Sequence, residues 1–263
     1  QSVCADEGML LPLLLKAFES DMQARGMKLT AEDIYSVNQA SLKDAILQFG
    51  GGCTAELVSG QGLLLTNHHC GYDAIATASS VQNNYLRDGF YAYNKDQEIK
   101  TELTVQFLLR IEDVTKQVQD KIKGIEDWTE RTKKLQDAYK SITEKVADKE
   151  NGISGRIYSM FKDNQYIMYV YQTYKDVRLV GTPPESIGKF GGDTDNWEWP
   201  RHTGDFSIFR VYASKDGKPA DFSADNPLNF GIGLGCSQPP AMPIWARFSC
   251  AKRPLPKSPE TCI

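Results

Sequence analysis

The chain has 263 residues, enough for one large domain or two small ones with a substantial core. Its apolar fraction of 41% and charged fraction of 24% are ordinary for a globular protein. The formal net charge of −4 provides no basic surface for nucleic acid, and no apolar run approaches the roughly 20 residues that cross a bilayer. We therefore expect neither a nucleic-acid partner nor a membrane span.

The first 50 residues have the pattern of short helices. Leu10–Arg25 is predicted to be a helix, because Pro12 lies in its first turn and apolar side chains recur at helical spacing. Thr30 is typical of a helix cap, and Ser41–Phe49 is predicted to be a second short helix ended by three glycines. We expect these helices to pack against the rest of the protein and to have a structural role.

Strands are predicted next. Glu56–Thr66 is predicted to form strands on both sides of a turn at residues 59–62. Leu63–Leu65 is a continuous apolar run, as expected for a strand buried on both faces. Thr101–Arg110 and Phe206–Ala213 alternate between apolar and polar residues, which predicts two further strands.

A helical pattern occupies the middle of the chain. Apolar residues recur every three or four positions over Ile111–Val146, and Gly124 interrupts them, so we predict two helices with a stripe that faces the core. Tyr166–Tyr171 fits a strand or a helix equally well. The last 33 residues hold six of the 12 prolines and three of the six cysteines without any periodicity, so we expect residues 231–263 to form a disordered tail.

The first stretch that could carry chemistry runs from Gly50 to Tyr72. It places Cys53 after a glycine turn and ends a predicted strand with His68, His69 and Cys70. A histidine beside a cysteine at the end of a buried strand is the way a chymotrypsin-type barrel presents its general base. A disulfide between Cys53 and Cys70 would contribute about 3 kcal/mol to the stability of the fold in the chain-entropy model. We favour an oxidising compartment for this protein.

The second stretch is residues 190–206, a glycine-rich segment with acids and two tryptophans that is typical of a binding loop. Asp205 stands immediately before the predicted strand at Phe206. A buried carboxylate there could accept the Nδ1–H hydrogen bond of a histidine and leave Nε2 free as a base. His69 is the natural partner. His68 could replace it, and Asp193 or Asp195 could replace Asp205.

A metal site is not expected. A zinc ion would need two or three ligands from a small set to converge: His68, His69, His202, Cys53 and Cys70. Neighbouring side chains on a strand point to opposite faces, so His68 and His69 would be poor co-ligands. None of the cysteines forms a CxxC pair, so a zinc ribbon is absent.

Both stretches, together with Asp6–Met9 and Ser41–Ala45, resemble the bacterial dipeptidyl-peptidase 7 and 11 family of serine exopeptidases over roughly residues 5–230. The resemblance implies an α+β fold with a mostly β catalytic core. This would be the first barrel of a chymotrypsin-like double β-barrel, with added N-terminal helices and inserted helices at about residues 111–160.

The resemblance also implies roles for single residues. His69 corresponds to the catalytic base and Asp205 to the aspartate of the triad, while Asn196 and Trp197 match residues that hold the free amino terminus of the peptide substrate. Family members are periplasmic or surface-associated, form homodimers and need no cofactor, and the same is expected here.

The family's nucleophile is a serine in a Gly-Asn-Ser-Gly motif, which this sequence lacks. Ser154 is the nearest look-alike, but it precedes Asp205 and lies beside helical sequence, so we do not expect it to act. We expect a chain that stops before the catalytic serine, with a frameshifted or truncated end, and that is inactive by itself. The alternative is a non-catalytic module that binds peptide amino termini.

Overall fold

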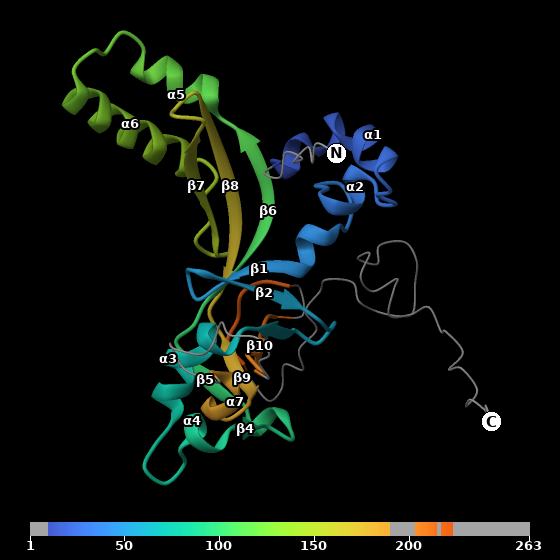
Figure 1. Ribbon diagram of the computed structural model, residues 1–263. Coiled ribbons are helices and arrows are strands. Elements are labelled where there is room, and N and C mark those ends of the chain that lie inside the picture. The colour runs from blue at the N-terminus through green and yellow to red at the C-terminus, as the bar shows by residue number, and fades with distance from the viewer. Residues whose placement is uncertain (1–9, 190–202, 215–216, 223–263) are drawn as a thin grey trace, which may run out of the picture.

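The computed structural model describes residues 10–189, 203–214 and 217–222 (Figure 1). Within these ranges ten strands form one sheet, in which β5 pairs with β9 and the others follow the order β4-β9-β10-β3-β2-β1-β6-β8-β7. All pairings between these strands are antiparallel. The strands are β1 (Ile46–Phe49), β2 (Cys53–Leu57), β3 (Leu63–Thr66), β4 (Phe90–Tyr91), β5 (Ile99–Thr101), β6 (Val105–Asp113), β7 (Ile153–Met160), β8 (Gln165–Tyr174), β9 (Val177–Thr182) and β10 (Ser207–Val211).

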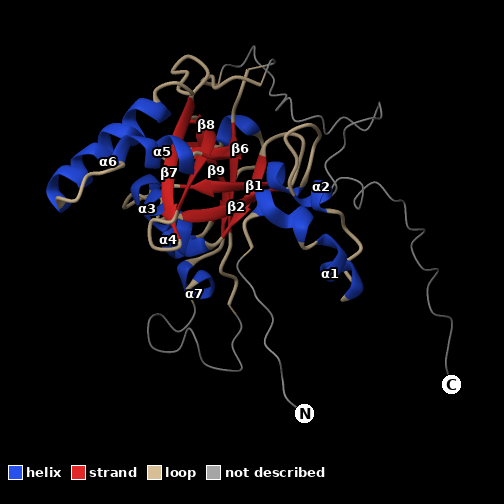
Figure 2. Ribbon diagram, turned by 90° about the horizontal axis from the view of Figure 1, so that it is seen from above, coloured by secondary structure: helices blue, strands red, loops and turns tan. Residues whose placement is uncertain are grey.

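The helices are short, except for one. They are α1 (Glu19–Ala24), α2 (Ala31–Ile34), α3 (His68–Ala78), α4 (Tyr85–Asp88), α5 (Thr115–Ile122), α6 (Trp128–Thr143) and α7 (Glu185–Gly188), with 3-10 turns at Pro12–Ala17, Leu42–Ala45 and Lys95–Gln97. Figure 2 shows α5 and α6 on one side of the strands and α1 and α2 on the other. No helix in the described ranges is long and apolar enough to cross a membrane.

The apolar core of the described part of the chain has two parts. The larger part lies where β1, β2, β3, β9 and β10 meet α3, and includes Phe49, Ile75 and Phe209, all without exposed surface. The Phe49 and Phe209 rings lie 4.8 Å apart. The smaller part packs α5 and α6 on β8 through residues such as Val118 and Met168. Figure 1 shows these two helices at the end of the long β6–β7–β8 arm, away from α3.

Several predicted elements are confirmed. Thr30 caps α2, since its Oγ1 accepts from the Asp33 N–H at 3.1 Å and the Asp33 carboxylate accepts from the Thr30 N–H at 2.9 Å. Glu56–Thr66 does turn between two strands, Phe206–Ala213 contains β10, and the ambiguous Tyr166–Tyr171 lies within β8. Leu10–Arg25 is helical, although it is divided into a 3-10 turn and α1.

The prediction of a helix over Ser41–Phe49 is wrong beyond its first turn. Leu42–Ala45 is a 3-10 turn, and Ile46–Phe49 is strand β1. Leu47 and Phe49 are buried on one face of that strand, which pairs with β2 on one side and β6 on the other. Pairing with the neighbouring strand β2 and the distant strand β6 therefore outweighs the local helical pattern.

Three other expectations need correction. Leu63–Leu65 is not buried on both faces, because Leu64 has no exposed surface whereas Leu65 is 39% exposed. The helical pattern predicted from Ile111 begins too early, since β6 continues to Asp113 in register with β8. The apolar stripe faces the core at Val118, but Trp128 at its middle is 75% exposed. The expectation for residues 231–263 lies outside the described residues.

Candidate active site

The two histidines lie at a junction where a strand turns directly into a helix. Strand β3 ends at Thr66, which pairs with Ser207 of β10. Asn67 remains extended, and helix α3 begins at His68, with its first turn closed by a hydrogen bond from the Cys70 N–H to the Asn67 carbonyl at 3.2 Å. The expectation that both histidines lie on a strand is therefore wrong.

The helix separates the environments of the two histidines. Successive helical residues point about 100° apart rather than to opposite faces. His68 points into the core and has no exposed surface, whereas the His69 side chain is 65% exposed. Of these two histidines, only His69 is therefore exposed to solvent.

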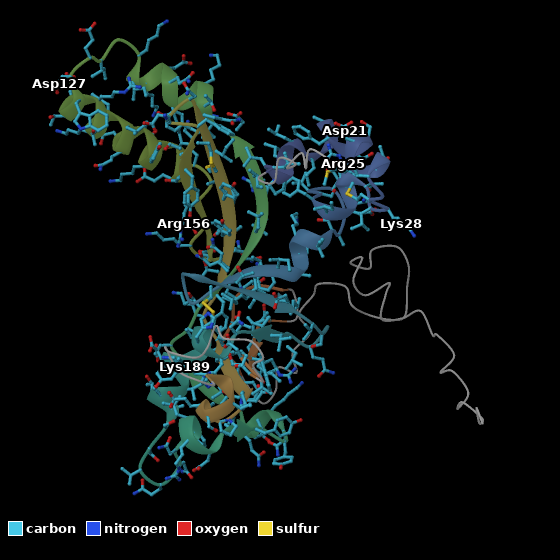
Figure 3. All side chains as sticks on the ribbon, viewed as in Figure 1. Asp21, Arg25, Lys28, Asp127, Arg156 and Lys189 are labelled. Atoms are coloured by element: carbon cyan, nitrogen blue, oxygen red, sulfur yellow. A yellow bond between two sulfur atoms is a disulfide. The ribbon has the colours of Figure 1, made fainter. Side chains whose placement is uncertain are left out.

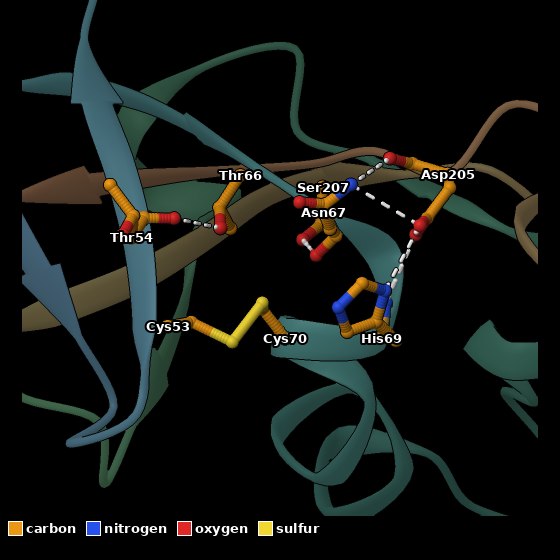
Figure 4. The surroundings of a disulfide bond; sticks show 8 residues. All are labelled: Cys53, Thr54, Thr66, Asn67, His69, Cys70, Asp205 and Ser207. Carbon is orange, nitrogen blue, oxygen red and sulfur yellow. Dashed lines mark hydrogen bonds and ion pairs between the residues drawn. A yellow bond between two sulfur atoms is a disulfide. The ribbon is translucent and has the colours of Figure 1, made fainter. Parts of the chain in front are cut away.

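The structure brings His69 and Asp205 together, as the sequence led us to expect (Figure 4). The His69 Nδ1 lies 2.9 Å from the Asp205 Oδ2, and the His69 backbone N–H donates to Oδ1 at 3.2 Å. The Asn67 side-chain amide donates to both the Oδ2 and the backbone carbonyl of Asp205, at 3.2 Å in each case. The carboxylate therefore receives hydrogen bonds from the junction at both of its oxygens.

These contacts keep Asp205 ionised. Burial would raise the pKa of this carboxyl group, but the backbone N–H and the ring of His69 outweigh it and hold the pKa below its usual value. An ionised Asp205 accepts the Nδ1–H of His69, which leaves the lone pair on Nε2. No described residue hydrogen-bonds to Nε2. This is the arrangement of a general base that waits for a proton donor.

Two residues that the sequence analysis missed fix this junction. Asn67 holds Asp205 as described, and the Ser207 Oγ donates to the Asn67 carbonyl at 2.9 Å. Their only signal in the sequence is position: Asn67 directly precedes the histidines, and Ser207 stands two residues after Asp205. Gly71 lets α3 approach β10, since a Cβ there would lie 2.8 Å from the Ser207 Oγ and 2.9 Å from the Phe209 ring.

Cys53 and Cys70 form the pair that the sequence analysis expected. Their Sγ atoms lie 2.02 Å apart as a disulfide, with 6.0 Å between the Cα atoms. The bond joins β2 to the first turn of α3, beside His69. Figure 3 shows it in yellow between the long arm and the lower part of the molecule.

The same corner contains a possible set of metal ligands. Cys53, His69 and Cys70 each offer a ligand atom, and these atoms lie within 4.8 Å of one another, the one such group found among the described residues. Three of the five candidate ligands therefore converge. In the disulfide form the two sulfurs are bonded to each other, so only His69 retains a lone pair suited to a cation.

The alternative base, His68, is less well placed. Neither of its ring nitrogens hydrogen-bonds to a described residue, and burial lowers its pKa. A Cβ on Gly188 would lie 2.6 Å from its ring, so α7 covers it closely. His68 is therefore held neutral inside the protein, away from solvent.

The remaining candidates separate into two groups. Asn196, Trp197, His202 and the alternative carboxylates Asp193 and Asp195 lie outside the described residues. Ser154 lies on β7, and four strands separate β7 from β3 in the sheet order, a span of about 24 Å at the usual strand spacing. Ser154 is therefore not a partner for His69 within this chain.

The chain is similar to known proteins over most of its length. Residues 5–230 match the family described as Peptidase S46. A dipeptidyl-peptidase 7 from Capnocytophaga gingivalis is 51% identical over 228 residues, which cover 84% of this chain and 31% of the relative. An Asp/Glu-specific dipeptidyl-peptidase from the same organism is 52% identical over 223 residues, covering 83% of this chain and 31% of the relative.

A solved structure is also similar. The crystal structure of Porphyromonas endodontalis DPP11 in complex with the dipeptide Arg-Asp superimposes with a TM-score of 0.77 at 47% identity, covering 86% of this chain and 33% of that one. The chain thus spans about a third of the length of the relatives it matches.

Proposed function

Because this chain belongs to the peptidase S46 family, we propose that it supplies the general base and the orienting carboxylate of a serine-type dipeptidyl-peptidase. His69 is the base and Asp205 the carboxylate. The observation that carries the proposal is the 2.9 Å contact between Nδ1 of His69 and Oδ2 of Asp205, which leaves Nε2 accessible to a hydroxyl group.

The proposed mechanism follows from this contact. Nε2 of His69 takes the proton of a serine hydroxyl as that oxygen attacks the peptide carbonyl, and later returns it to the leaving amine. Asp205 holds the ring in the required tautomer and stabilises the imidazolium that forms. Its lowered pKa keeps it charged while the proton is on His69.

The proposed substrates are peptides with a free amino terminus. The two curated relatives described above carry the names dipeptidyl-peptidase 7 and Asp/Glu-specific dipeptidyl-peptidase, at nearly equal identity to this chain. Both names describe a dipeptidyl-peptidase, so we propose dipeptide release without a preference for particular side chains. Asn196 and Trp197 are proposed to hold the peptide's amino terminus, as the family resemblance implies.

The chain alone is proposed to be inactive. Acyl transfer needs a nucleophile and an oxyanion hole as well as a base, and the 263 residues contain no Gly-Asn-Ser-Gly run. We further propose that the strands around α3 belong to the first barrel of a chymotrypsin-like double β-barrel, in a homodimer. The Cys53–Cys70 disulfide supports a periplasmic or secreted location.

The test uses the isolated chain and a chimera. In the chimera, residues 5–230 replace the matching segment of the Capnocytophaga gingivalis dipeptidyl-peptidase 7. We expect the chimera to release chromogenic dipeptides from free but not from N-acetylated substrates, and the isolated chain to release none. His69→Ala should abolish turnover by the chimera.

Three outcomes would contradict the proposal. Turnover by the chimera that survives His69→Ala would refute the base, and turnover by the isolated chain that depends on His69 would refute its inactivity. Binding of free but not acetylated peptides, with no turnover even in the chimera, would favour the alternative of a non-catalytic module.

A further inference from the structure

We propose that reduction of the Cys53–Cys70 disulfide converts this corner of the molecule into a binding site for a zinc-like divalent cation, with Cys53, Cys70 and Nε2 of His69 as ligands. This site goes beyond the proposed peptidase function. It would take a borderline-soft cation, because thiolate and imidazole together favour Zn²⁺ over hard cations such as Mg²⁺.

The first support is convergence. The ligand atoms of Cys53, His69 and Cys70 already lie within 4.8 Å of one another in the folded chain. Two sulfurs bound to one zinc at the usual bond length lie about 3.8 Å apart. With the Cα atoms 6.0 Å apart, rotation of the two side chains can provide that separation without moving β2 or α3.

The second support is the contact behind His69. A histidine that ligates a metal usually donates its other ring N–H to a carboxylate, which fixes the tautomer and orients the ring. Asp205 already accepts from Nδ1 at 2.9 Å, so Nε2 is the nitrogen left for a metal. Figure 4 shows the His69 ring between Asp205 and the disulfide, with the other nitrogen on the sulfur side.

The site is open to solvent. The His69 side chain is 65% exposed, and Cys53 and Cys70 are only partly buried. A reductant and a cation can therefore reach it without unfolding of the core. Three protein ligands leave the fourth position of a tetrahedral zinc ion to water.

The chemistry balances with a dithiol as the reductant. One thiolate of the dithiol attacks a sulfur of the Cys53–Cys70 bond, and its second thiol then closes a cyclic disulfide, so two electrons pass to the protein and two cysteine thiols are released. Binding of the cation displaces the proton from each thiol, because the thiolate is the form that ligates a metal.

Occupation of Nε2 has a consequence that rests on the proposed function. A nitrogen bound to a cation cannot accept the proton of a serine hydroxyl. Reduction in the presence of zinc would therefore switch the peptidase off, whereas the disulfide form would leave His69 free.

The test measures cobalt binding and does not measure hydrolysis, so its outcome is independent of the peptidase proposal. The full chain carries Cys4→Ser, Cys236→Ser, Cys250→Ser and Cys262→Ser, which leaves only the pair of interest. After reduction with a trialkylphosphine and anaerobic removal of the reagent, Co²⁺ is titrated while tetrahedral thiolate–cobalt absorption is recorded. We expect one cobalt per reduced chain and none per oxidised chain.

Two variants test the ligand set. His69→Gln should eliminate the tetrahedral cobalt spectrum. Asp205→Asn should weaken cobalt affinity by about 10- to 100-fold, because it removes the group that orients the ligand. Asp73→Asn, which removes an exposed carboxylate from the same helix, should leave the affinity unchanged.

Circular dichroism of the reduced chain decides whether the site forms in the folded state. A reduced chain that keeps its fold but binds no cobalt would overturn the proposal, as would cobalt binding of equal affinity in His69→Gln. A reduced chain that unfolds would overturn it as well, because the proposal requires the β2–α3 corner to persist without the disulfide.

Discussion

The Nδ1 of His69 lies 2.9 Å from the Oδ2 of Asp205, although 136 residues separate them in the chain. Two strands produce this contact. Strand β3 ends three residues before His69, and β10 begins two residues after Asp205, antiparallel to β3. The segment before β10 is fixed from the other side, since the Gly204 N–H donates to the Ile187 carbonyl at 2.8 Å.

The first prediction concerns this pair in the chimera described above. Asp205→Asn should lower kcat by about 10³- to 10⁴-fold, because the asparagine amide no longer fixes the tautomer of His69 or stabilises the imidazolium. The Michaelis constant should change little. Asp73→Asn is the matched control and should retain full turnover. An Asp205→Asn chimera within tenfold of the parent would contradict the role of Asp205.

The second prediction concerns the stability of the chain at acid pH. The pKa of Asp205 is lower in the folded protein than in the unfolded chain, because the hydrogen bonds from His69 outweigh the effect of burial. Its stabilising contribution is therefore complete above the unfolded pKa, about 3.9, and is lost as the pH falls through the lower folded pKa.

Urea unfolding of the chain and of Asp205→Asn measures this contribution. The difference in unfolding free energy between the two should be constant from pH 7 to about pH 5, and should shrink below about pH 4. If this free-energy difference increased as the pH falls, or did not depend on pH, the folded protein would not favour the ionised carboxylate.

The contact could be predicted from the sequence, but its surroundings could not. The alternation in Phe206–Ala213 indicates a strand that begins after Asp205, and Cys53 and Cys70 indicate where β2 meets α3. The position of Asn67 and Ser207 around Asp205 depends on the antiparallel register of β3 and β10, and no local pattern encodes a pairing between segments 140 residues apart.

The local conformation of the two histidines could not be predicted from the local sequence pattern. An apolar run that ends in two histidines predicts a strand that continues through them. On such a strand, His68 and His69 would point to opposite faces. The chain instead turns into α3 at His68, and the Ser207 Oγ donates to the carbonyl of Asn67, the residue just before the helix. Similarly, Ile46–Phe49 forms a strand only because β2 and β6 flank it.

The third prediction concerns the disulfide. Cys53 and Cys70 close a loop with a sequence separation of 17 residues, so replacing both with serine should lower the free energy of unfolding by about 3 kcal/mol. Adding reductant to the native chain should give a similar loss, and adding it to the double variant should have no further effect. Equal stability of the native and double-serine chains by urea unfolding would contradict this prediction.

The fourth prediction concerns the close approach of α3 to β10. Gly71→Ala should destabilise the protein by about 1–3 kcal/mol, because the new Cβ would meet the Ser207 Oγ at 2.8 Å and the Phe209 ring at 2.9 Å. The gain in helix propensity, about 1 kcal/mol, offsets only part of this cost over most of the range. Gly52→Ala is the control, since a Cβ there meets nothing within 4 Å. Thermal unfolding should place Gly71→Ala well below the parent and Gly52→Ala near it.

The last prediction concerns the buried His68. Burial lowers its pKa, and neither ring nitrogen hydrogen-bonds to a described residue. The unfolded chain therefore binds a proton at this residue more readily than the folded chain. The unfolding free energy should fall as the pH drops from the unfolded pKa, about 6.5, towards the lower folded value.

His68→Phe should remove this component, because phenylalanine fills a similar space beside Gly188 and does not titrate. Urea unfolding between pH 7 and about pH 5 should show a stability loss in the parent that is reduced in the variant. At pH 5 the variant should equal or exceed the parent in stability, since no buried group then has to be protonated on unfolding. If the unfolding free energy depended on pH identically in both proteins, His68 would bind protons equally well in the folded and unfolded chains. Its ring would then not be desolvated by α7.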